Sequence, residues 1–284
     1  MKILVTGATG FIGNYVVKEL LKNNCQVIAT SLSEEKAKAV SWFSQVKYIP
    51  FDLKNFDEGT NYYSFFGEPD AMIHLAWEGL PNYQEAFHTQ ENLPRHLAFL
   101  TNLVNGGLKN LSVTGTCFEY GMKEGCLNED MGCEPANPYA IAKNELRIQL
   151  ELLQTTLPFN FKWIRLFYMY GQGQSVKSLI SQLETALDNN EPQFNMSGGE
   201  QVRDFLPVEL VAANIVTIAL QNKVQAIVNC CSGKPVTVKS FVEDYLKAKN
   251  KSIPLNLGYY PYTDYEPMKF WGDTSKLKLI QSND

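Results

Sequence analysis

The residues best suited to acid–base chemistry are a tyrosine and a lysine four positions apart, Tyr139 and Lys143. On a helix, residues at i and i+4 lie one turn apart on the same face, so the phenol and the ammonium would be neighbours. A nearby cation favours the phenolate, which predicts a tyrosine pKa below its ordinary value of about 10. The pair is therefore a candidate for proton transfer.

The same spacing occurs twice more, at Tyr245/Lys249 and Tyr265/Lys269. With 14 tyrosines and 25 basic residues in 284, chance alone supplies such pairs. Pro267 lies between Tyr265 and Lys269 and disfavours a helix there, whereas the helix predicted around Tyr245 has no other candidate group near it. Spacing by itself does not identify the catalytic pair.

Hydroxyl groups distinguish Tyr139 from the other tyrosines. A strand predicted at Leu111 to Thr114 is followed by Gly115-Thr116-Cys117-Phe118-Glu119-Tyr120-Gly121. Ligands of open α/β sheets bind at the carboxyl ends of the strands, so a hydroxyl here could hydrogen-bond a reacting oxygen. Thr116 and Thr114 are both candidates for this role.

A glycine turn follows the first predicted strand, Ile3-Leu4-Val5, and leads into a helix. Gly7 permits a tight turn, Gly10 lets backbone N–H groups approach a pyrophosphate, and Gly13 lets the helix pack against the strand. The spacing is GxxGxxG rather than the more common GxGxxG. It predicts a dinucleotide site, and the alternative is that the glycines only end a strand.

The second predicted strand ends without the acidic residue that binds the adenosine ribose of NAD. It ends in Thr30, Ser31 and Leu32, and Ser31-x-x-Glu34 is interpreted as a capping box that starts the next helix. Small hydroxyls there, with Lys36 and Lys38 nearby, would tolerate a 2′-phosphate. The sequence therefore favours NADP as the cofactor, with NAD as the alternative.

Short β-branched runs alternate with helical periodicity through the first half of the chain, which predicts an α/β fold with a doubly wound parallel sheet of the Rossmann type. Long helices are predicted at 85–106 and 137–156, and the pattern loosens beyond residue 171. We predict a dinucleotide-binding domain at 1–168 and 204–230. A smaller C-terminal substrate lobe at 169–203 and 231–284 would complete the chain.

Composition excludes several classes of protein. The net charge is −5 without a basic run, which argues against nucleic acid as a partner. Six cysteines without CxxC spacing and three histidines argue against a disulfide framework and a metal site. No membrane-spanning run or secretion signal is recognised, so we expect a cytoplasmic protein with no membrane partner.

Six motifs, in order, resemble the extended short-chain dehydrogenase/reductase family, the NAD-dependent epimerase/dehydratase superfamily, over nearly the whole chain. They are TGATGFIG at 6–13, Asp52-Leu53, HLAW at 74–77, GTCFEYG at 115–121, NPYAIAK at 137–143 and RDFLPV at 203–208. The resemblance implies that Tyr139 is the general acid/base, that Lys143 lowers its pKa and binds the nicotinamide ribose, and that Thr116 hydrogen-bonds the reacting oxygen.

The resemblance also implies a set of binding residues. The cofactor-binding residues would be Gly7, Gly10, Phe11, Ile12, Gly13, Ser31, Asp52, Leu53, Leu75, Ala76, Trp77, Tyr139 and Lys143. Thr116, Tyr168 and Arg203 would bind the substrate, Arg203 through a diphosphate. Alternatives stay open: Arg203 as a surface partner of Asp204, Tyr168 as a core residue, and Asn92 as either a helix-positioned site residue or a surface residue.

Members of this family act mostly on nucleotide-linked sugars. Cys117 and Phe118 stand where the dehydratases carry an acid and a base, and neither shuttles protons as elimination requires. The motifs look most like NADPH-dependent reductases of the C4 ketone of nucleotide-linked 4-keto-6-deoxyhexoses. The alternatives are a nucleotide-sugar 4-epimerase or a non-catalytic NADP-binding sensor. The family also implies a homodimer formed through the helices at 85–106 and 137–156.

Overall fold

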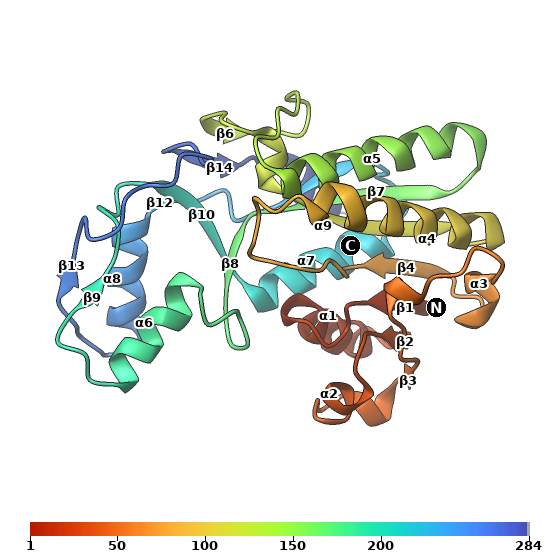
Figure 1. Cartoon of the computed structure of the whole chain (residues 1–284), viewed down its shortest axis with the longest axis horizontal. Helices are drawn as coiled ribbons and strands as arrows, with labels where there is room; N and C mark the ends of the chain where they lie inside the picture. Colours follow the sequence, from red (N-terminus) through yellow and green to blue (C-terminus); the bar gives the residue numbers. More distant parts are fainter. Residues whose placement is uncertain (283–284) are drawn as a thin grey trace.

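The computed structural model describes residues 1–282, and its largest element is a sheet of seven strands in the order β11-β7-β5-β4-β1-β2-β3 (Figure 1). All neighbouring strands of this sheet pair in parallel. The strands are β1 (Lys2–Thr6), β2 (Gln26–Thr30), β3 (Lys47–Tyr48), β4 (Ala71–His74), β5 (Asn110–Thr116), β7 (Asn160–Leu166) and β11 (Ile227–Cys230). The predicted doubly wound Rossmann sheet is confirmed.

Helices cover both faces of the sheet because successive strand residues point to opposite sides. Ile3 and Val5 of β1 face the core shared with α1 and α7, whereas Leu4 faces the core shared with α4 and α5. The helices of this domain are α1 (Phe11–Lys22), α2 (Glu34–Lys38), α3 (Tyr62–Phe65), α4 (Leu93–Gly106), α5 (Pro138–Thr156) and α7 (Val208–Leu220).

Helix starts follow local capping chemistry. The side chain of Asn137 accepts a hydrogen bond from the Ala140 N–H at 2.9 Å and starts α5 at its predicted position. The helix predicted from residue 85 begins instead with a π-helical turn, His88–Asn92, that leads into α4. The predicted capping box at Ser31 is wrong, because the side chain of Ser33 caps α2 by accepting from the Lys36 N–H.

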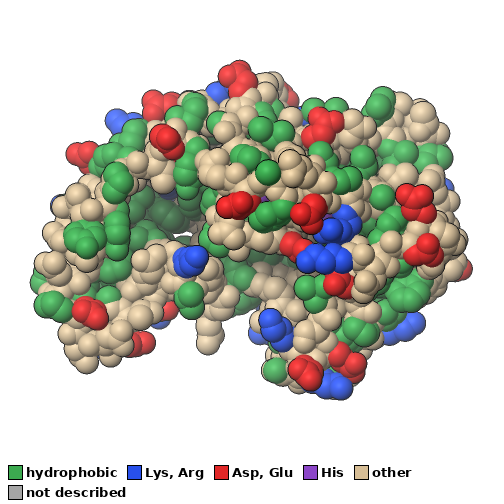
Figure 2. All heavy atoms as spheres, viewed as in Figure 1, with side chains coloured by type: hydrophobic (Ala, Val, Ile, Leu, Met, Phe, Trp, Pro, Cys, Tyr) green, Lys and Arg blue, Asp and Glu red, His purple; other side chains and the backbone are tan. Residues whose placement is uncertain are grey.

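A smaller lobe lies beside the carboxyl ends of the strands (Figure 1). Its hydrophobic core includes Ile180, Leu183, Phe194 and Phe241. Its elements are β8 (Tyr168–Tyr170), α6 (Leu179–Asp188), β9 (Phe194–Asn195), β10 (Val202–Pro207), β12 (Pro235–Thr237), α8 (Val238–Ala248) and β13 (Leu255–Asn256). Figure 2 shows the surface hollowed between this lobe and the sheet domain.

The domain division predicted from the sequence stays a proposal. Within 231–284, the short strand β14 (Phe270–Gly272) pairs with β6 (Gly125–Leu127), and the last helix, α9 (Ser275–Gln281), packs against α7 and β11. Leu277 and Ile280 of α9 belong to the core of the sheet domain. The end of the described chain therefore packs with the sheet rather than with the lobe.

Residues 1–282 contain neither a candidate membrane span nor a candidate metal site. Every helix in that range is too short or too polar to span a bilayer. No group of three or more His, Cys, Asp and Glu side chains in the same range could hold a metal ion.

Candidate active site

The glycine turn has the shape that its spacing predicts. Gly7 adopts a φ of +65°, and a Cβ on it would lie 2.9 Å from the Ala76 nitrogen. Gly10 is the N-cap residue of α1. A Cβ on Gly13 would lie 2.1 Å from the Gly7 carbonyl oxygen. Glycine is therefore required at Gly7 and Gly13 for β1, α1 and the end of β4 to approach closely.

A first cavity lies between this turn and the end of β2. Ser31 is fixed there, because its hydroxyl accepts from the Thr9 hydroxyl at 2.8 Å and contacts the Tyr48 hydroxyl at 2.8 Å. The cavity is lined by Thr6, Gly7, Thr9, Thr30, Ser31, Leu32, Ser33, Lys36, Phe51, Leu53, Ala76, Trp77, Glu78, His96 and Phe99.

The chemistry of the first cavity fits the adenosine half of a dinucleotide. Thr30 is 2% exposed, and its hydroxyl has no hydrogen-bond partner among the described residues, which leaves a buried polar group for a ligand to satisfy. Ser33 and Lys36 add further donors at the same wall. Glu78, also on the wall, has its carboxylate 3.1 Å from Lys54 and 3.9 Å from Arg95.

A second cavity borders the start of α1 and is lined by two of the predicted catalytic residues. Thr116 and Tyr139 both line it, as do Phe11 and Ile12 of α1 and Tyr168 of β8. The remaining lining residues are Leu80, Tyr83, Gly115, Cys117, Phe118, Leu166, Phe167, Met169 and Gln174. The structure thus brings together residues from α1, β5, α5 and β8 that are far apart in sequence.

Tyr139 lies in the first turn of α5 and is 7% exposed. Burial raises the pKa of its phenol, the charges of Tyr83, Glu119 and Cys117 raise it further, and a hydrogen bond with Thr116 lowers it. The expected lowering of this pKa by Lys143 is therefore wrong for the protein alone, because removing a phenolate from water is the larger effect. The phenol remains a proton donor at neutral pH.

Lys143 lies one turn further along α5 and is 2% exposed. Its Nζ donates to the Thr114 carbonyl oxygen at 2.9 Å and lies 4.1 Å from the ring centroid of Trp77. Burial lowers the pKa of Lys143 to about 7, and the charge of Glu119 raises it. The ammonium is thus held from two sides, by the end of β5 and by an indole ring.

The hydroxyls of Thr114 and Thr116 meet different surroundings. The Thr114 hydroxyl donates to the His74 carbonyl oxygen at 3.2 Å, so it is used between β5 and β4. Strand β5 extends beyond the predicted end, to Thr116, and places the Thr116 side chain on the wall of the second cavity. This geometry favours Thr116 over Thr114 as the hydroxyl that meets a substrate.

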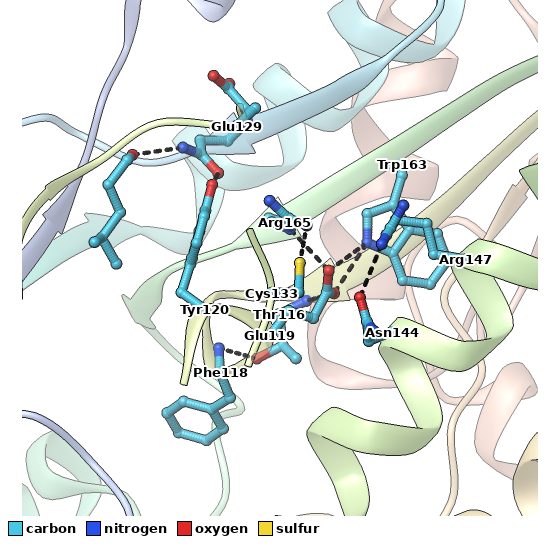
Figure 3. A network of polar contacts seen from close by, with 12 residues as sticks. Thr116, Phe118, Glu119, Tyr120, Glu129, Cys133, Asn144, Arg147, Trp163 and Arg165 are labelled. Carbon is cyan, nitrogen blue, oxygen red and sulfur yellow. Dashed lines mark hydrogen bonds and ion pairs between the residues drawn. The ribbon is translucent and has the colours of Figure 1, made fainter. Parts of the chain in front are cut away.

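A buried polar network behind Thr116 was not predicted from the sequence (Figure 3). Glu119, fully buried, accepts from the Thr116 N–H at 2.8 Å, from Trp163 Nε1 at 2.9 Å and from Arg165 Nε at 2.8 Å. Arg165 also donates to Cys133 Sγ at 2.8 Å. The only sequence signal is an acidic residue inside GTCFEYG, where the local pattern gives no partner for it.

Arg203 and Tyr168 share a partner that the sequence does not reveal. Arg203 is 4% exposed, and its Nη2 lies 3.0 Å from Glu266 Oε2, which also accepts from the Tyr168 hydroxyl. The alternative of a surface Arg203 paired with Asp204 is wrong, since Asp204 is buried and accepts from the Ser232, Gly233 and Gly272 N–H groups. Glu266 thus holds both predicted substrate residues.

The three histidines of the chain form contacts near the site that the sequence did not predict. The Thr6 hydroxyl and His74 Nδ1 are 2.8 Å apart, and His74 Nε2 is 2.7 Å from His96 Nδ1. His96 stacks on Trp77 with ring centroids 4.6 Å apart, and Trp77 donates to His88 Nδ1 at 3.0 Å. Burial lowers the pKa of His74 to about 3, so it stays neutral.

Asn92 is buried in the structure, whereas the predicted adenine and cofactor residues lie near the first cavity. Asn92 is 1% exposed, and its Nδ2 donates to the Glu78 carbonyl oxygen at 3.1 Å, so the surface interpretation of Asn92 is wrong. Leu53 lines the first cavity, whereas the side chain of Asp52 accepts from the Lys54 N–H at 2.9 Å. The Leu75 N–H donates to the Thr6 hydroxyl at 3.2 Å.

Known proteins of one family are similar to this chain over most of its length. A family model described as the NAD dependent epimerase/dehydratase family matches residues 3–231. The chain is 32% identical over 273 residues to a dTDP-6-deoxy-L-talose 4-dehydrogenase (NAD(+)) of Aggregatibacter actinomycetemcomitans, covering 96% of this chain and 99% of that protein. It is 22% identical to an Escherichia coli dTDP-4-dehydro-6-deoxyglucose reductase, covering 85% and 79% of the two chains.

Solved structures of the same fold include two epimerases. A UDP-N-acetylglucosamine 4-epimerase from Methanobrevibacter ruminantium superposes with a TM-score of 0.86 at 23% identity, covering 98% of this chain and 91% of that one. A UDP-glucuronic acid 4-epimerase from Bacillus cereus, solved with UDP-glucuronic acid and NAD, gives a TM-score of 0.84 at 23% identity, covering 100% and 94%. The family model and the 32% identical relative confirm the resemblance found in the sequence: this chain belongs to the NAD-dependent epimerase/dehydratase family.

Proposed function

We propose that this protein reduces the C4 ketone of a nucleotide-linked 4-keto-6-deoxyhexose, with NADPH as the hydride donor. The observation that carries the proposal is the wall of the second cavity, where a protonated phenol and a threonine hydroxyl lie together beside a buried ammonium. Two relatives are named for chemistry at C4 of such sugars, one as a 4-dehydrogenase and one as a reductase. These names describe the same kind of hydride transfer in opposite directions.

The residues of the cavity can perform the proton transfer that ketone reduction needs. The bound dinucleotide supplies a hydride to the carbonyl carbon. Thr116 and Tyr139 donate hydrogen bonds to the carbonyl oxygen, and Tyr139 gives its proton to the alkoxide as negative charge develops there. Lys143, one helical turn away, then stabilises the phenolate that remains, as long as its amine is protonated.

Elimination of water is not supported at the same wall. Cys117 follows Thr116, and burial raises the pKa of its thiol, which stays neutral. Phe118, the next residue, carries no exchangeable proton. A dehydratase needs an acid and a base at these positions, whereas a reductase does not.

The proposed preference for NADPH rests on the first cavity. Ser31, Ser33 and Lys36 line it at the end of β2, and the carboxylate of Glu78 is paired with two cations. Lys36→Ala should raise the KM for NADPH roughly tenfold, the equivalent of one charge-assisted hydrogen bond, and leave the KM for NADH unchanged. Lys38→Ala is the matched control, because Lys38 is exposed and pairs with Glu34 at 3.0 Å.

A carboxylate introduced at the same place tests the preference from the other side. Ser31→Asp should shift the preference toward NADH, because the new charge would repel a 2′-phosphate. Equal or better use of NADH by the unmodified protein would contradict the proposal and would agree with the relative whose name carries NAD(+).

A panel of NDP-4-keto-6-deoxy sugars, assayed for NADPH consumption, tests the reaction itself. We expect stoichiometric oxidation of NADPH and one C4 epimer as product. Sugar turnover without net NADPH oxidation would replace the reductase with a 4-epimerase. Cofactor binding without turnover of any sugar in the panel would favour a non-catalytic sensor.

We further propose a homodimer formed through α4 and α5. Three apolar side chains form one exposed stripe along α5: Ile141 at 43%, Ile148 at 40% and Leu152 at 60% exposure. Sedimentation at micromolar concentration should give a dimer, and Leu152→Glu should give a monomer. A monomeric unmodified protein would contradict this arrangement.

A further inference from the structure

We propose that Glu119 is a positioning residue for this reaction: its buried carboxylate fixes the backbone at Thr116, two residues along β5 from the Thr114 carbonyl oxygen that accepts from Lys143. The inference rests on the proposed function for its catalytic meaning. Its structural basis is the network shown in Figure 3, which joins the end of β5 to β7.

The carboxylate of Glu119 is immobilised at both oxygens. Oε1 accepts from the Thr116 N–H at 2.8 Å and from Trp163 Nε1 at 2.9 Å, while Oε2 accepts from Arg165 Nε at 2.8 Å. A Cβ on Gly115 would lie 2.3 Å from Oε1, so only glycine there lets the carboxylate approach. A group held by three donors in the interior cannot change rotamer without leaving buried donors unpaired.

The fixed carboxylate also holds the turn that carries the Thr116 hydroxyl. The Thr116 side chain and Glu119 form a reciprocal capping box, in which the Phe118 N–H donates to the Thr116 hydroxyl oxygen at 3.2 Å. With an acceptor site on that oxygen occupied, the hydroxyl hydrogen is available to donate toward Tyr139 and the second cavity. Glu119 therefore positions this hydroxyl indirectly, through the backbone of Thr116 and the turn that follows it.

The charge of Glu119 acts on the catalytic pair as well. It raises the pKa of Lys143 against the effect of burial, and it raises the pKa of Tyr139. The titratable groups around Lys143 on other elements are His74 of β4, His88 of the π-helical turn and His96 of α4, whose pKa values are all lowered. Since those rings are neutral, Glu119 supplies the charge that keeps the ammonium protonated.

The test must separate this role from simple structural support. Glu119→Gln alone would leave Arg165 charged and buried without its partner, which destabilises proteins strongly. The double variant Glu119→Gln/Arg165→Met removes both charges and is the main test. Arg165→Met alone keeps the carboxylate and should not lower the pKa of Lys143.

Two measurements on the whole chain test this role. The first is an NMR titration of the Lys143 ε-carbon, assigned by its loss in Lys143→Met. The second is the pH dependence of kcat/KM. In the double variant the pKa of Lys143 should fall by about one unit, and the alkaline limb of the profile should move to lower pH by the same amount.

A matched control is available in Glu129, another buried carboxylate, which accepts from the Asn229 N–H at 2.8 Å. Glu129→Gln can lower stability but should leave the Lys143 titration and the pH profile unchanged. If the folded double variant titrates like the unmodified protein, Glu119 is structural only and the inference is overturned. The Lys143 titration needs no substrate, so it decides this point even where the sugar panel disproves the reductase.

Discussion

The spacing Tyr-x-x-x-Lys occurs at α5 and again at α8, in opposite surroundings. On α5, Lys143 is buried and donates to the Thr114 carbonyl oxygen. At the end of α8, the Lys249 side chain is 57% exposed, and its Nζ lies 3.9 Å from Glu184 and 5.5 Å from the ring centroid of Tyr245. Both pairs place an ammonium near a phenol, but only one is removed from water.

The difference lies in what other elements bring to each pair. Strand β5 places Thr116 beside Tyr139, and Trp77, after β4, covers Lys143. At α8 the neighbour is Glu184 of α6, which accepts from the Tyr245 hydroxyl and helps burial raise the pKa of that phenol. An exposed ion pair of this kind contributes little energy. A Tyr-x-x-x-Lys pair can therefore serve as a catalytic site only where strands from elsewhere in the chain bury it.

The comparison predicts its largest effect for Tyr139→Phe. Because a proton delivered only in the transition state contributes little to ground-state binding, kcat should fall by about 10² to 10⁴ while KM changes little. Steady-state kinetics with the 4-keto sugar measure both constants. Tyr245→Phe should retain normal kcat, and near-normal kcat in Tyr139→Phe would break the comparison and the mechanism together.

Removal of the two lysines gives the next largest contrast. Lys143→Met should lower kcat by about 10² to 10³, since it removes the charge that stabilises the developing phenolate, and should also weaken cofactor binding. Lys249→Met should change neither constant. Equal losses in the two variants, with circular dichroism showing both folded, would contradict the assignment of the site to α5.

The two threonines of β5 sharpen the comparison within the active region. Thr116→Val should lower kcat by about 10², because it removes a donor to the reacting oxygen. Thr114→Val removes a hydroxyl that bonds the His74 carbonyl oxygen and should affect stability rather than kcat. A larger loss of kcat in Thr114→Val than in Thr116→Val would assign the reacting hydroxyl to Thr114.

The smallest predicted effect is a shift in pH dependence. Burial lowers the pKa of Lys143 to about 7, so the ammonium loses its proton as the pH rises through that value. The kcat/KM of the unmodified enzyme should therefore decline on the alkaline side near pH 7. Lys143→Arg should move the decline to higher pH, because a guanidinium stays protonated. An unchanged alkaline limb would show that another group controls it.

Local sequence determined the fold class, the glycine turn and the pairing of Tyr139 with Lys143. Gly7, Gly10 and Gly13 specify the turn through their backbone requirements, and alternating strands and helices specify a parallel sheet. The pair Tyr139/Lys143 follows from helical geometry within five residues. These features could be predicted because their causes act between residues that are close in the chain.

The tertiary structure alone decided which polar groups meet across the sheet. Glu119 finds Arg165 46 positions away, and Arg203 finds Glu266 63 positions away. The direction of the Tyr139 pKa was mispredicted for the same reason, since it depends on burial by several distant segments rather than on the nearby lysine. Burial and the pairing of buried charges are properties of the packed molecule, and no local pattern encodes them.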